Sequence, residues 1–363
     1  MTEQINTPEL RFPEFYGEWE ENQLSTILEI GTGKSKVQSN ENGKYNILGS
    51  TGIIGKSHTY DYEGDFILTA RVGHYAGKLY KHAGKVNISD NTIYLYNFIN
   101  KNFIYESLNV FKLEKLVFGS GQPLIKASDL KKLKIRVPVS KEQKKIGTFF
   151  SKLDRQIELE EEKLELLEQQ KRGYMQKIFS QQLRFKDEKG NDYPKWIFKK
   201  FEEIFKVVPS KKYQIKSSEI EDNASIPVID QGQNLILGFS NNKEKVFNDF
   251  KNVIIYGDHT TVIKRSDKPF IIGGDGVKLL TSKVDSDISY LYNALQYFNV
   301  KSEGYKRHFS ILKNKDFYIS TSIEEQKRIA NIFNKLDKYI EKQFAKVELL
   351  KQRKQGLLQK MFV

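Results

Sequence analysis

Glycine-containing loops in both halves of this chain carry hydrogen-bonding side chains suited to contact with nucleic acid. Amide, hydroxyl, imidazole and guanidinium groups can read base edges in a groove, and Lys and Arg can pair with phosphates. Each of these side chains could equally be an ordinary exposed polar group in a turn. We predict DNA contacts in the first half from Lys34, Lys36, Arg71, His74, Tyr75, Lys78, Ser120, Gln122 and Lys126, and in the second half from Gln231, Gln233, His259, Thr260, Thr261, Lys264, Arg265, Lys278, Lys306, Arg307 and His308.

The chain carries no recognisable catalytic motif. Residues 30–35 read IGTGKS, like the end of a phosphate-binding loop, but Leu28 stands where that motif requires glycine. Residues 273–276 lack the ligand spacing of a calcium loop, and the five histidines are too dispersed for a metal pattern. The Asn/Asp-Pro-Pro-aromatic motif of DNA methyltransferases is missing from the sequence. We therefore predict no catalytic residue, no metal site and no enzymatic activity of the chain's own.

Composition favours a polyanionic partner. The 363 residues carry a formal net charge of +13 and a pI near 9.3, and nucleic acid is the commonest partner of such a protein. A basic protein that merely stays soluble is the alternative. Without cysteine, disulfides and thiolate metal sites are excluded. The polar start MTEQINTPELRF is unlike a signal peptide, so we expect a soluble, cytoplasmic protein.

Two long segments of the chain are nearly the same sequence. Residues 142–179 and 325–362 align without a gap at an offset of 183 residues and share 20 of 38 positions. A different globular segment precedes each copy, which indicates two halves built on one plan.

Each copy has an apolar seam in which the spacing alternates between four and three residues. This period, sustained over about five heptads, is typical of a coiled coil rather than of the broader face of a globular helix. Polar residues interrupt the seam at two matching places in each copy, Glu160 and Lys171 in the first and Gln343 and Lys354 in the second. The predicted seam residues are Ile146, Phe150, Leu153, Ile157, Leu164, Leu167 and Ile178 in the first copy, and Ile329, Phe333, Leu336, Ile340, Val347, Leu350 and Met361 in the second.

The simplest partner for one seam is the other copy in the same chain. We therefore predict an antiparallel intrachain coiled coil, with parallel pairing between chains as the alternative. At about 1.5 Å per residue, 38 helical residues make a rod of roughly 57 Å. The acidic run at residues 160–162 could face the more basic second copy, for example at Lys346 and Lys351, although exposed charge runs are usually just solvated.

The two globular segments begin alike and read as short strands broken by glycine. Each opens with Leu-Arg-Phe, at residues 10–12 and 183–185, followed by a tryptophan, Trp19 or Trp196, and a stretch that we predict to be a short amphipathic helix. Runs of β-branched and aromatic residues then indicate strands. A helix is predicted near the end of each segment, over residues 102–116 and 289–298. The predicted strands are KYNILG, TGIIG, DFILTARVG and NTIYLYN in the first segment and IPVID, LILGF, NVIIYGDHTTVIK, PFIIGG and GVKLL in the second.

These motifs together make the chain resemble the specificity subunit of Type I restriction-modification systems. The resemblance rests on the duplicated EQ(K/R)xI…KLD…QK(I/M)F helices, the LRF…W openings, FGSGQPLIKASDLKKLKIRVP and YGDHTTVIKRSDKPFIIGGDGVKLL. It covers nearly the full length, although the basic stretch before the second helix departs from that before the first. It implies an α+β fold in which two mixed α/β target-recognition domains of similar fold are separated by the paired helices, with pseudo-two-fold symmetry. We place the domains at residues 1–141 and 183–324 and the spacer helices at 142–182 and 325–363.

The resemblance also implies partners and cofactors. Each recognition domain would read one half of a split site on double-stranded DNA, and the helices would dock two methyltransferase subunits. S-adenosylmethionine would lie on the methyltransferase, and ATP and magnesium on the partner subunits, which include a motor-nuclease subunit. No cofactor is expected in this chain.

Simple geometry agrees with a gapped DNA reader. A rod of roughly 57 Å spans at most about 17 base pairs, so modules at its ends would read two half-sites separated by unread bases. Because the two globular segments differ, the half-sites should differ too. Two alternatives stay open: a DNA-modifying enzyme with a dispersed active site, and a structural coiled-coil scaffold that bridges partners without sequence-specific DNA binding.

Overall fold

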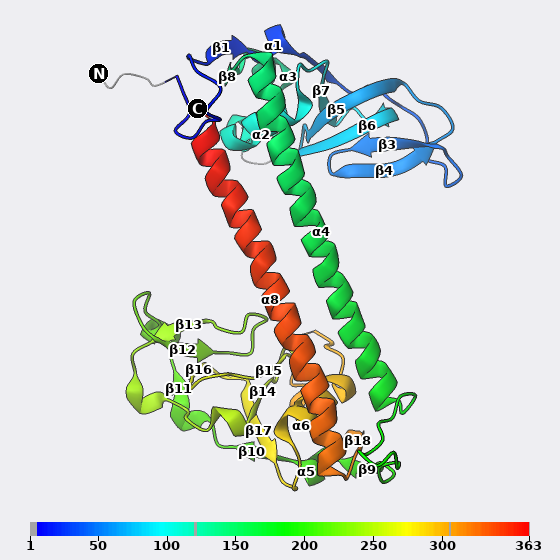
Figure 1. Cartoon of the computed structure of the whole chain (residues 1–363), viewed down its shortest axis with the longest axis vertical. Helices are drawn as coiled ribbons and strands as arrows, with labels where there is room; N and C mark the ends of the chain where they lie inside the picture. Colours follow the sequence, from blue (N-terminus) through cyan, green and yellow to red (C-terminus); the bar gives the residue numbers. More distant parts are fainter. Residues whose placement is uncertain (1–5, 120–121, 305, 363) are drawn as a thin grey trace. The chain divides into compact units, whose positions relative to one another are not determined.

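The computed structural model describes residues 6–119, 122–304 and 306–362 (Figure 1). The chain divides into two compact units: unit 1 comprises Met1–Glu162 with Ala345–Val363, and unit 2 comprises Lys163–Phe344. Two long helices, α4 (Ser140–Phe179) and α8 (Ile323–Met361), each contribute to both units. The domain boundaries at residues 141, 182 and 324 stay a prediction.

Unit 1 is built around a six-stranded sheet of order β2-β7-β5-β6-β3-β4. All neighbouring strands are antiparallel except β3 and β6, which are parallel. Because alternate side chains point to opposite faces, Ile67 and Leu95 join the core that contains α2, whereas Phe66 and Leu68 form a second cluster. The elements are β2 (Glu29–Thr32), β3 (Tyr45–Gly49), β4 (Gly52–Ser57), β5 (Tyr62–Ala70), β6 (Leu79–Ile88), β7 (Thr92–Tyr96) and α2 (Lys101–Phe111).

A two-stranded ribbon closes unit 1 beside the long helices. The strand β1 (Glu20–Gln23) pairs antiparallel with β8 (Lys134–Val137), which follows the 3₁₀ turn η1 (Leu113–Leu116) and the helix α3 (Ala127–Lys132). The helix predicted directly after Trp19 is therefore wrong in extent, because the chain first forms β1 and only then the four-residue helix α1 (Leu24–Ile27). Pairing with β8 gives the backbone N–H and C=O groups of β1 the hydrogen-bond partners that they would otherwise have found within a helix.

Unit 2 contains two four-stranded sheets. One has the order β10-β17-β14-β15 and is antiparallel, and the other has the order β11-β16-β12-β13, in which β16 lies parallel to both neighbours. The strands are β10 (Phe205–Val208), β11 (Gln214–Ile215), β12 (Ile226–Ile229), β13 (Gly238–Ser240), β14 (Ile254–Gly257), β15 (Ile263–Lys264), β16 (Ile271–Gly273) and β17 (Val277–Ser282).

The remainder of unit 2 repeats the ribbon of unit 1. After Trp196 the chain forms β9 (Ile197–Lys200), which pairs with β18 (Asp316–Ile319), and then the short helix α5 (Phe201–Ile204). The helix predicted directly after Trp196 is therefore also wrong in extent, because the chain forms β9 before it forms α5. The helix α6 (Ile288–Phe298) matches the predicted helix at 289–298, and α7 (Phe309–Lys313) was not predicted. Short 3₁₀ turns complete the unit at η2 (Lys211–Tyr213), η3 (Ser217–Glu219), η4 (Lys243–Lys245) and η5 (Phe250–Asn252).

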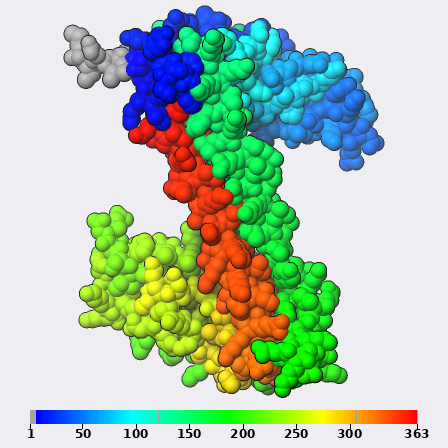
Figure 2. Space-filling view, in the orientation of Figure 1, coloured from blue at the N-terminus to red at the C-terminus, as the bar shows by residue number. Residues whose placement is uncertain are grey.

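The two long helices pair antiparallel within each unit, which confirms the predicted coiled coil (Figure 1). In unit 1, Asp154 of α4 lies 2.6 Å from Lys354 of α8, and Glu161 lies 2.9 Å from Lys351. In unit 2, Lys171 lies 2.6 Å from Asp337. As the residue number increases along α4, the residue number of its contact in α8 decreases, as antiparallel pairing requires. Figure 2 shows the surfaces of the two helices in contact in each unit.

The predicted seam positions are all buried or half-buried. Ile146 and Phe150 join the core of unit 1, while Ile178, Ile329 and Phe333 join the core of unit 2. The ends of the seam therefore also pack against the globular parts. The remaining seam residues are Leu153, Ile157, Val347, Leu350 and Met361 in unit 1, and Leu164, Leu167, Leu336 and Ile340 in unit 2.

In unit 1 the Glu-Gln pair near the start of α4 anchors that helix to the opening segment of the chain. Arg11 donates to both carboxylate oxygens of buried Glu142, at 2.8 and 2.7 Å. The Gln143 amide donates to the Pro138 carbonyl at 2.9 Å. Leu10 donates its backbone N–H to the carbonyl of Lys360 in α8 at 2.8 Å. The Leu-Arg-Phe and Glu-Gln motifs thus act as one structural device.

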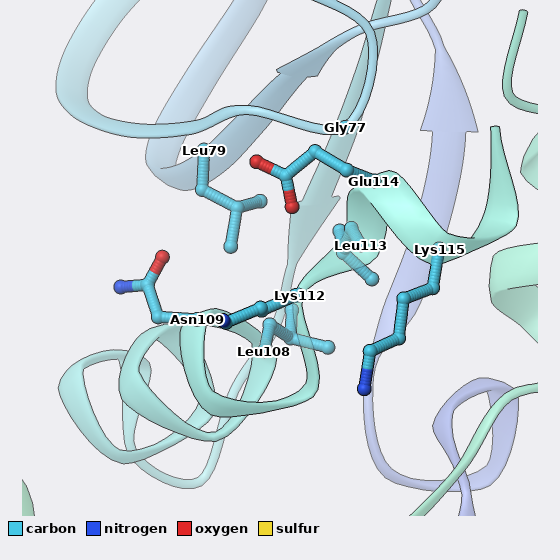
Figure 3. Close-up of a pocket in the computed structure, with 8 residues that line it drawn as sticks. All are labelled: Gly77, Leu79, Leu108, Asn109, Lys112, Leu113, Glu114 and Lys115. Atoms are coloured by element: carbon cyan, nitrogen blue, oxygen red, sulfur yellow. The ribbon is translucent and has the colours of Figure 1, made fainter. Parts of the chain in front are cut away.

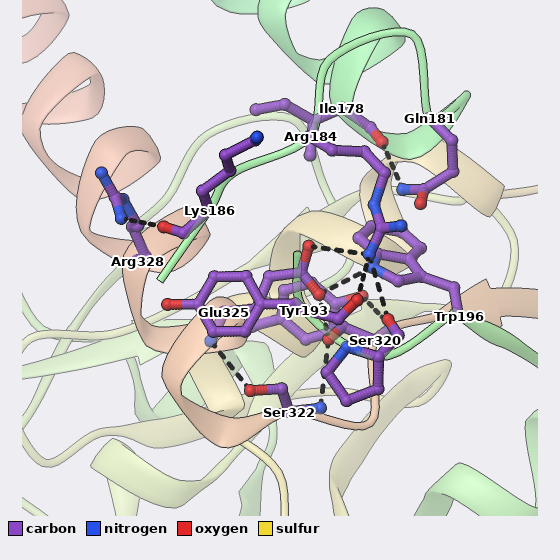
Figure 4. Close-up of polar contacts among 12 residues, drawn as sticks. Ile178, Gln181, Arg184, Lys186, Tyr193, Trp196, Ser320, Ser322, Glu325 and Arg328 are labelled. Atoms are coloured by element: carbon purple, nitrogen blue, oxygen red, sulfur yellow. Dashed lines mark hydrogen bonds and ion pairs between the residues drawn. The ribbon is translucent and has the colours of Figure 1, made fainter. Parts of the chain in front are cut away.

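Unit 2 repeats this device with different partners (Figure 4). Buried Glu325 accepts hydrogen bonds from the Trp196 indole N–H at 2.9 Å and from the Ser320 hydroxyl at 2.6 Å. Arg184 lies 4.0 Å from the same carboxylate. Gln326 donates to the Ser320 carbonyl at 2.7 Å. The indole and the hydroxyl both bond to Oε2 of Glu325, and the more distant Arg184 faces Oε1.

Candidate nucleic-acid interface

Two of the loops predicted in unit 1 form one surface. The loop at residues 71–78 follows β5, and the segment at 118–126 leads into α3. The Gly73 N–H donates to the Pro123 carbonyl at 2.8 Å, and the Ile125 N–H donates to the Arg71 carbonyl at 2.9 Å. Segments separated by about fifty residues in sequence are therefore held side by side by their backbones.

Cationic and aromatic side chains project from this surface. Arg71, His74, Tyr75, Lys78, Gln122 and Lys126 are all exposed. The ammonium of Lys78 lies 4.9 Å from the Tyr75 ring, and that of Lys126 lies 4.7 Å from the ring of Phe118, which is 43% exposed. Aromatic rings with nearby cations can contact both bases and phosphates. Ser120 lies outside the described residues.

Phe118 is a residue that the sequence reasoning missed. It stands immediately before the sequence Gly-Ser-Gly-Gln, so an aromatic residue beside these glycines was the available signal. Its backbone exchanges hydrogen bonds with Leu124 at 3.0 and 2.9 Å, which fixes the position of the Phe118 backbone.

The predicted lysines Lys34 and Lys36 lie on a third segment of unit 1 and are exposed. This segment and the 71–78 loop both bond to the start of β7: the Gly33 N–H donates to the Thr92 carbonyl at 2.9 Å, and the Arg71 N–H donates to the Asn91 carbonyl at 2.8 Å. The structure thus attaches both predicted segments to the same end of that strand.

A hollow beside the 71–78 loop is lined by residues of unit 1 (Figure 3). Its wall combines Gly77 and Leu79 with Leu108 and Asn109 of α2, and with residues 112–115. At Gly77, φ is +85° and an added Cβ would lie 2.8 Å from the Glu114 backbone nitrogen, so glycine is required for this close approach. The lining combines leucines with one amide and mixed charges.

Three segments of unit 2 are joined through the side chain of Gln231. The Gln231 amide oxygen accepts from the His259 N–H at 3.0 Å, and its amide nitrogen donates to the Asp275 carbonyl at 3.4 Å. The Thr260 hydroxyl donates to the Gln231 carbonyl. The turn after β12, the loop after β14 and the turn before β17 therefore form one cluster.

A fourth segment of unit 2 joins this cluster through Asp258. The carbonyl of Asp258 accepts from the His308 N–H at 2.8 Å, and its carboxylate accepts from the Phe309 N–H at 2.9 Å. As in unit 1, the loop after a central strand is thus hydrogen-bonded to the segment that precedes a short helix, α7 in place of α3. The same frame carries different side chains in the two units.

The structure gives Lys264 and His308 internal partners instead of a place on the surface. Lys264 is 5% exposed, and its ammonium donates to the carbonyls of Asp230, at 2.9 Å, and Asn234. Burial lowers the pKa of Lys264, opposed by the Asp230 carboxylate. His308 is fully buried, and its Nε2 accepts from the Glu303 N–H at 3.0 Å. These side chains stabilise the loops from within and are not exposed for contact with DNA.

Other predicted residues of unit 2 remain accessible. Gln233, Lys306 and Arg307 are exposed. The Arg265 guanidinium lies 5.3 Å from the Tyr292 ring, and the Lys278 ammonium lies 5.9 Å from the Phe309 ring. The remaining predicted residues, Gln231, His259, Thr260 and Thr261, are half-buried within the loop cluster. Fewer residues of unit 2 are therefore exposed than the sequence predicted as DNA contacts.

Over residues 6–119, 122–304 and 306–362, no group of three or more His, Asp or Glu side chains is arranged to hold a metal ion. Over the same residues, no helix is long and apolar enough to cross a membrane.

Comparison with known proteins decides the family. The model of the Type I restriction modification DNA specificity domain matches this chain twice, over residues 16–169 and 193–350. The chain belongs to this family. The two matches cover most of both units, in agreement with the duplication in the sequence and with the resemblance that the sequence motifs indicated.

Individual relatives of the specificity family agree with this assignment. The EcoR124I/EcoR124II specificity subunit of Escherichia coli is 33% identical over 93 residues, which span 25% of this chain and 23% of that relative. The crystal structure of the Type I restriction-modification S subunit from M. genitalium aligns with a TM-score of 0.72, covering 98% of this chain and 99% of that one at 19% identity. The similarity to the M. genitalium S subunit supports the fold of this specificity-family chain.

Proposed function

We propose that this chain is the DNA-reading subunit of a Type I restriction-modification complex and that each unit reads one half of an asymmetric, gapped site. The observation that carries the proposal is the repeated loop frame. The backbone tie between a strand-end loop and a pre-helix segment occurs in both units, at Arg71–Ile125 and at Asp258–His308. The exposed side chains on the two frames differ, so the two half-sites should differ.

The remaining functions that we propose belong to the helices and to partners. The paired α4 and α8 helices would set the unread gap and dock two methyltransferase subunits. These subunits would supply S-adenosylmethionine chemistry, and a motor-nuclease subunit would supply ATP- and magnesium-dependent cleavage. This chain would contribute recognition without catalysis of its own, in a complex bound to double-stranded DNA.

A binding titration at several salt concentrations tests the proposal. We expect the chain with its methyltransferase to bind duplex DNA and to lose affinity steeply as salt rises, because phosphate contacts release counterions. The chain without the methyltransferase should not methylate DNA. A complex without salt-sensitive DNA binding would favour the scaffold alternative, and methylation by the isolated chain would show an enzyme.

A further inference from the structure

The buried ammonium of Lys264 connects the two sheets of unit 2. Lys264 ends β15, which belongs to the β10-β17-β14-β15 sheet, whereas its acceptors lie just after β12 in the other sheet. Its Nζ reaches the Asp230 carbonyl at 2.9 Å, the Asp230 carboxylate at 3.5 Å and the Asn234 carbonyl. An ammonium has three donors, and here each has an oxygen acceptor.

The Lys264 ammonium bonds to the carbonyls at both ends of the segment at residues 230–234. Inside the segment, the Asp230 carboxylate also accepts from the Gly232 N–H at 2.9 Å, and Gln231 bonds to the neighbouring loops. The polar side chains left facing outward are those of Gln233 and Asn234, which are exposed. Gln and Asn amides can pair with an adenine edge through two hydrogen bonds when they are held in a fixed orientation.

We propose that Lys264 is a positioning residue that holds residues 230–234 in the shape that presents Gln233 and Asn234 to DNA. The inference rests on the proposed function and assigns Lys264 a role without contact to DNA. A lysine that is 5% exposed and fully bonded within the protein cannot pair with a phosphate unless the segment opens. Loss of its ammonium therefore frees the segment without removing a phosphate contact.

A phosphate-contacting lysine and a positioning lysine should affect the salt dependence of DNA affinity differently. A phosphate-contacting lysine contributes about 0.9 to the slope of log affinity against log salt and acts on all sequences alike. A positioning lysine leaves that slope unchanged and alters discrimination at the bases read by its segment.

The test compares Lys264→Met with two control lysines in the full chain assembled with its methyltransferase. Lys306→Met removes an exposed lysine of the same loop cluster, and Lys195→Met removes an exposed lysine outside it. The probe is a duplex carrying the motif that the wild-type complex methylates in its host, together with duplexes in which each recognised base pair is changed in turn.

We expect Lys264→Met to lower discrimination at one or more base pairs of one half-site by about fivefold or more. The other half-site and the salt slope should stay as in the wild type. Lys306→Met should instead weaken binding to every duplex and make the slope shallower by about one. Lys195→Met should change neither the discrimination nor the slope.

Wild-type discrimination in Lys264→Met, or a slope that becomes shallower by about one, would overturn the inference. If that variant does not fold, as judged by its melting curve, Asp230→Ala decides the question, because it removes the side-chain acceptor and keeps both backbone carbonyls that Lys264 contacts. Asp230→Ala should relax the same half-site, and an unchanged half-site would then refute the inference. A wild-type complex that recognises no motif would defeat the proposed function instead.

Discussion

At the scale of residues, two lysines at matching places in the repeat differ in their ion pairs, because only one of them also pairs with a buried glutamate. Lys171 and Lys354 each lie 2.6 Å from an aspartate of the other long helix. Lys354 also lies 2.9 Å from Glu106 of α2, whose side chain is 2% exposed. Burial raises the pKa of Glu106. Burial alone would lower the pKa of Lys354, but the hydrogen bonds and charges of Asp154 and Glu106 raise it.

We predict that Lys354→Met destabilises the chain far more than Lys171→Met. Removal of Lys354 leaves Glu106 as a buried charge without its cation, which costs about 3 kcal/mol. Removal of Lys171 leaves the partly exposed Asp337 and should cost about 1 kcal/mol or less. Urea unfolding of the full chain measures the difference. The double variant Lys354→Met with Glu106→Gln should recover most of the loss, and equal costs for the two single variants would contradict this account.

The same pair gives a pH dependence with a defined sign. A carboxyl group whose pKa is raised in the fold binds more protons when folded than when unfolded, so its contribution to stability is lost as pH rises through the raised pKa. The cost of Lys354→Met should therefore be largest at neutral pH and should shrink in acid, where Glu106 becomes neutral. Unfolding curves at several pH values test this, and a cost that grows in acid would show that Glu106 is not the cause.

At the scale of elements, we predict that the length of the antiparallel helix pair sets the length of the unread gap. Removing one heptad from α4 and the facing heptad from α8 shortens the pair by about 10 Å. At about 3.4 Å per base pair, the unread gap should shorten by about three base pairs, with both half-sites unchanged. Methylation mapping reads the gap directly.

A matched control removes the heptad from α4 alone. This deletion breaks the facing pairs along the seam and should abolish assembly rather than change the gap. An unchanged gap in the paired deletion, with methylation retained, would show that the helices do not set its length.

The elements that sequence reasoning found are those with a strong local pattern. The long helices follow from their heptads, and strands such as β5 and β17 follow from apolar runs between glycines. The ten-residue strand β6 was missed because His82, Gly84 and Lys85 break its apolar pattern. It forms because β5 and β3 hold it on both sides, and such pairing partners are not visible in a local window.

The sequence indicated where loops follow strands, but it did not indicate which of their side chains are exposed. Glycine with polar residues after a strand predicted these loops, and their DNA contacts stay a prediction. The burial of Lys264 and His308 depends on carbonyls and an amide of segments distant in sequence. An isolated lysine in a sequence cannot be assigned to a phosphate or to a carbonyl without that context.

At the scale of the whole molecule, one chain combines two copies of one plan whose loop frames carry different side chains. Each unit has its own hydrophobic core and its own loop frame, so substitutions in one unit should affect one half-site. We therefore expect two independent half-sites with a fixed gap between them.

Long-read methylation mapping of a host that carries this chain and its methyltransferase measures both half-sites and the gap between them. We predict a single bipartite motif with two unlike half-sites and a constant unread gap. A chain with Arg71→Ala and Tyr75→Ala should alter one half-site and leave the other and the gap intact. A methylated motif that is continuous, or loss of both half-sites in that variant, would contradict the account.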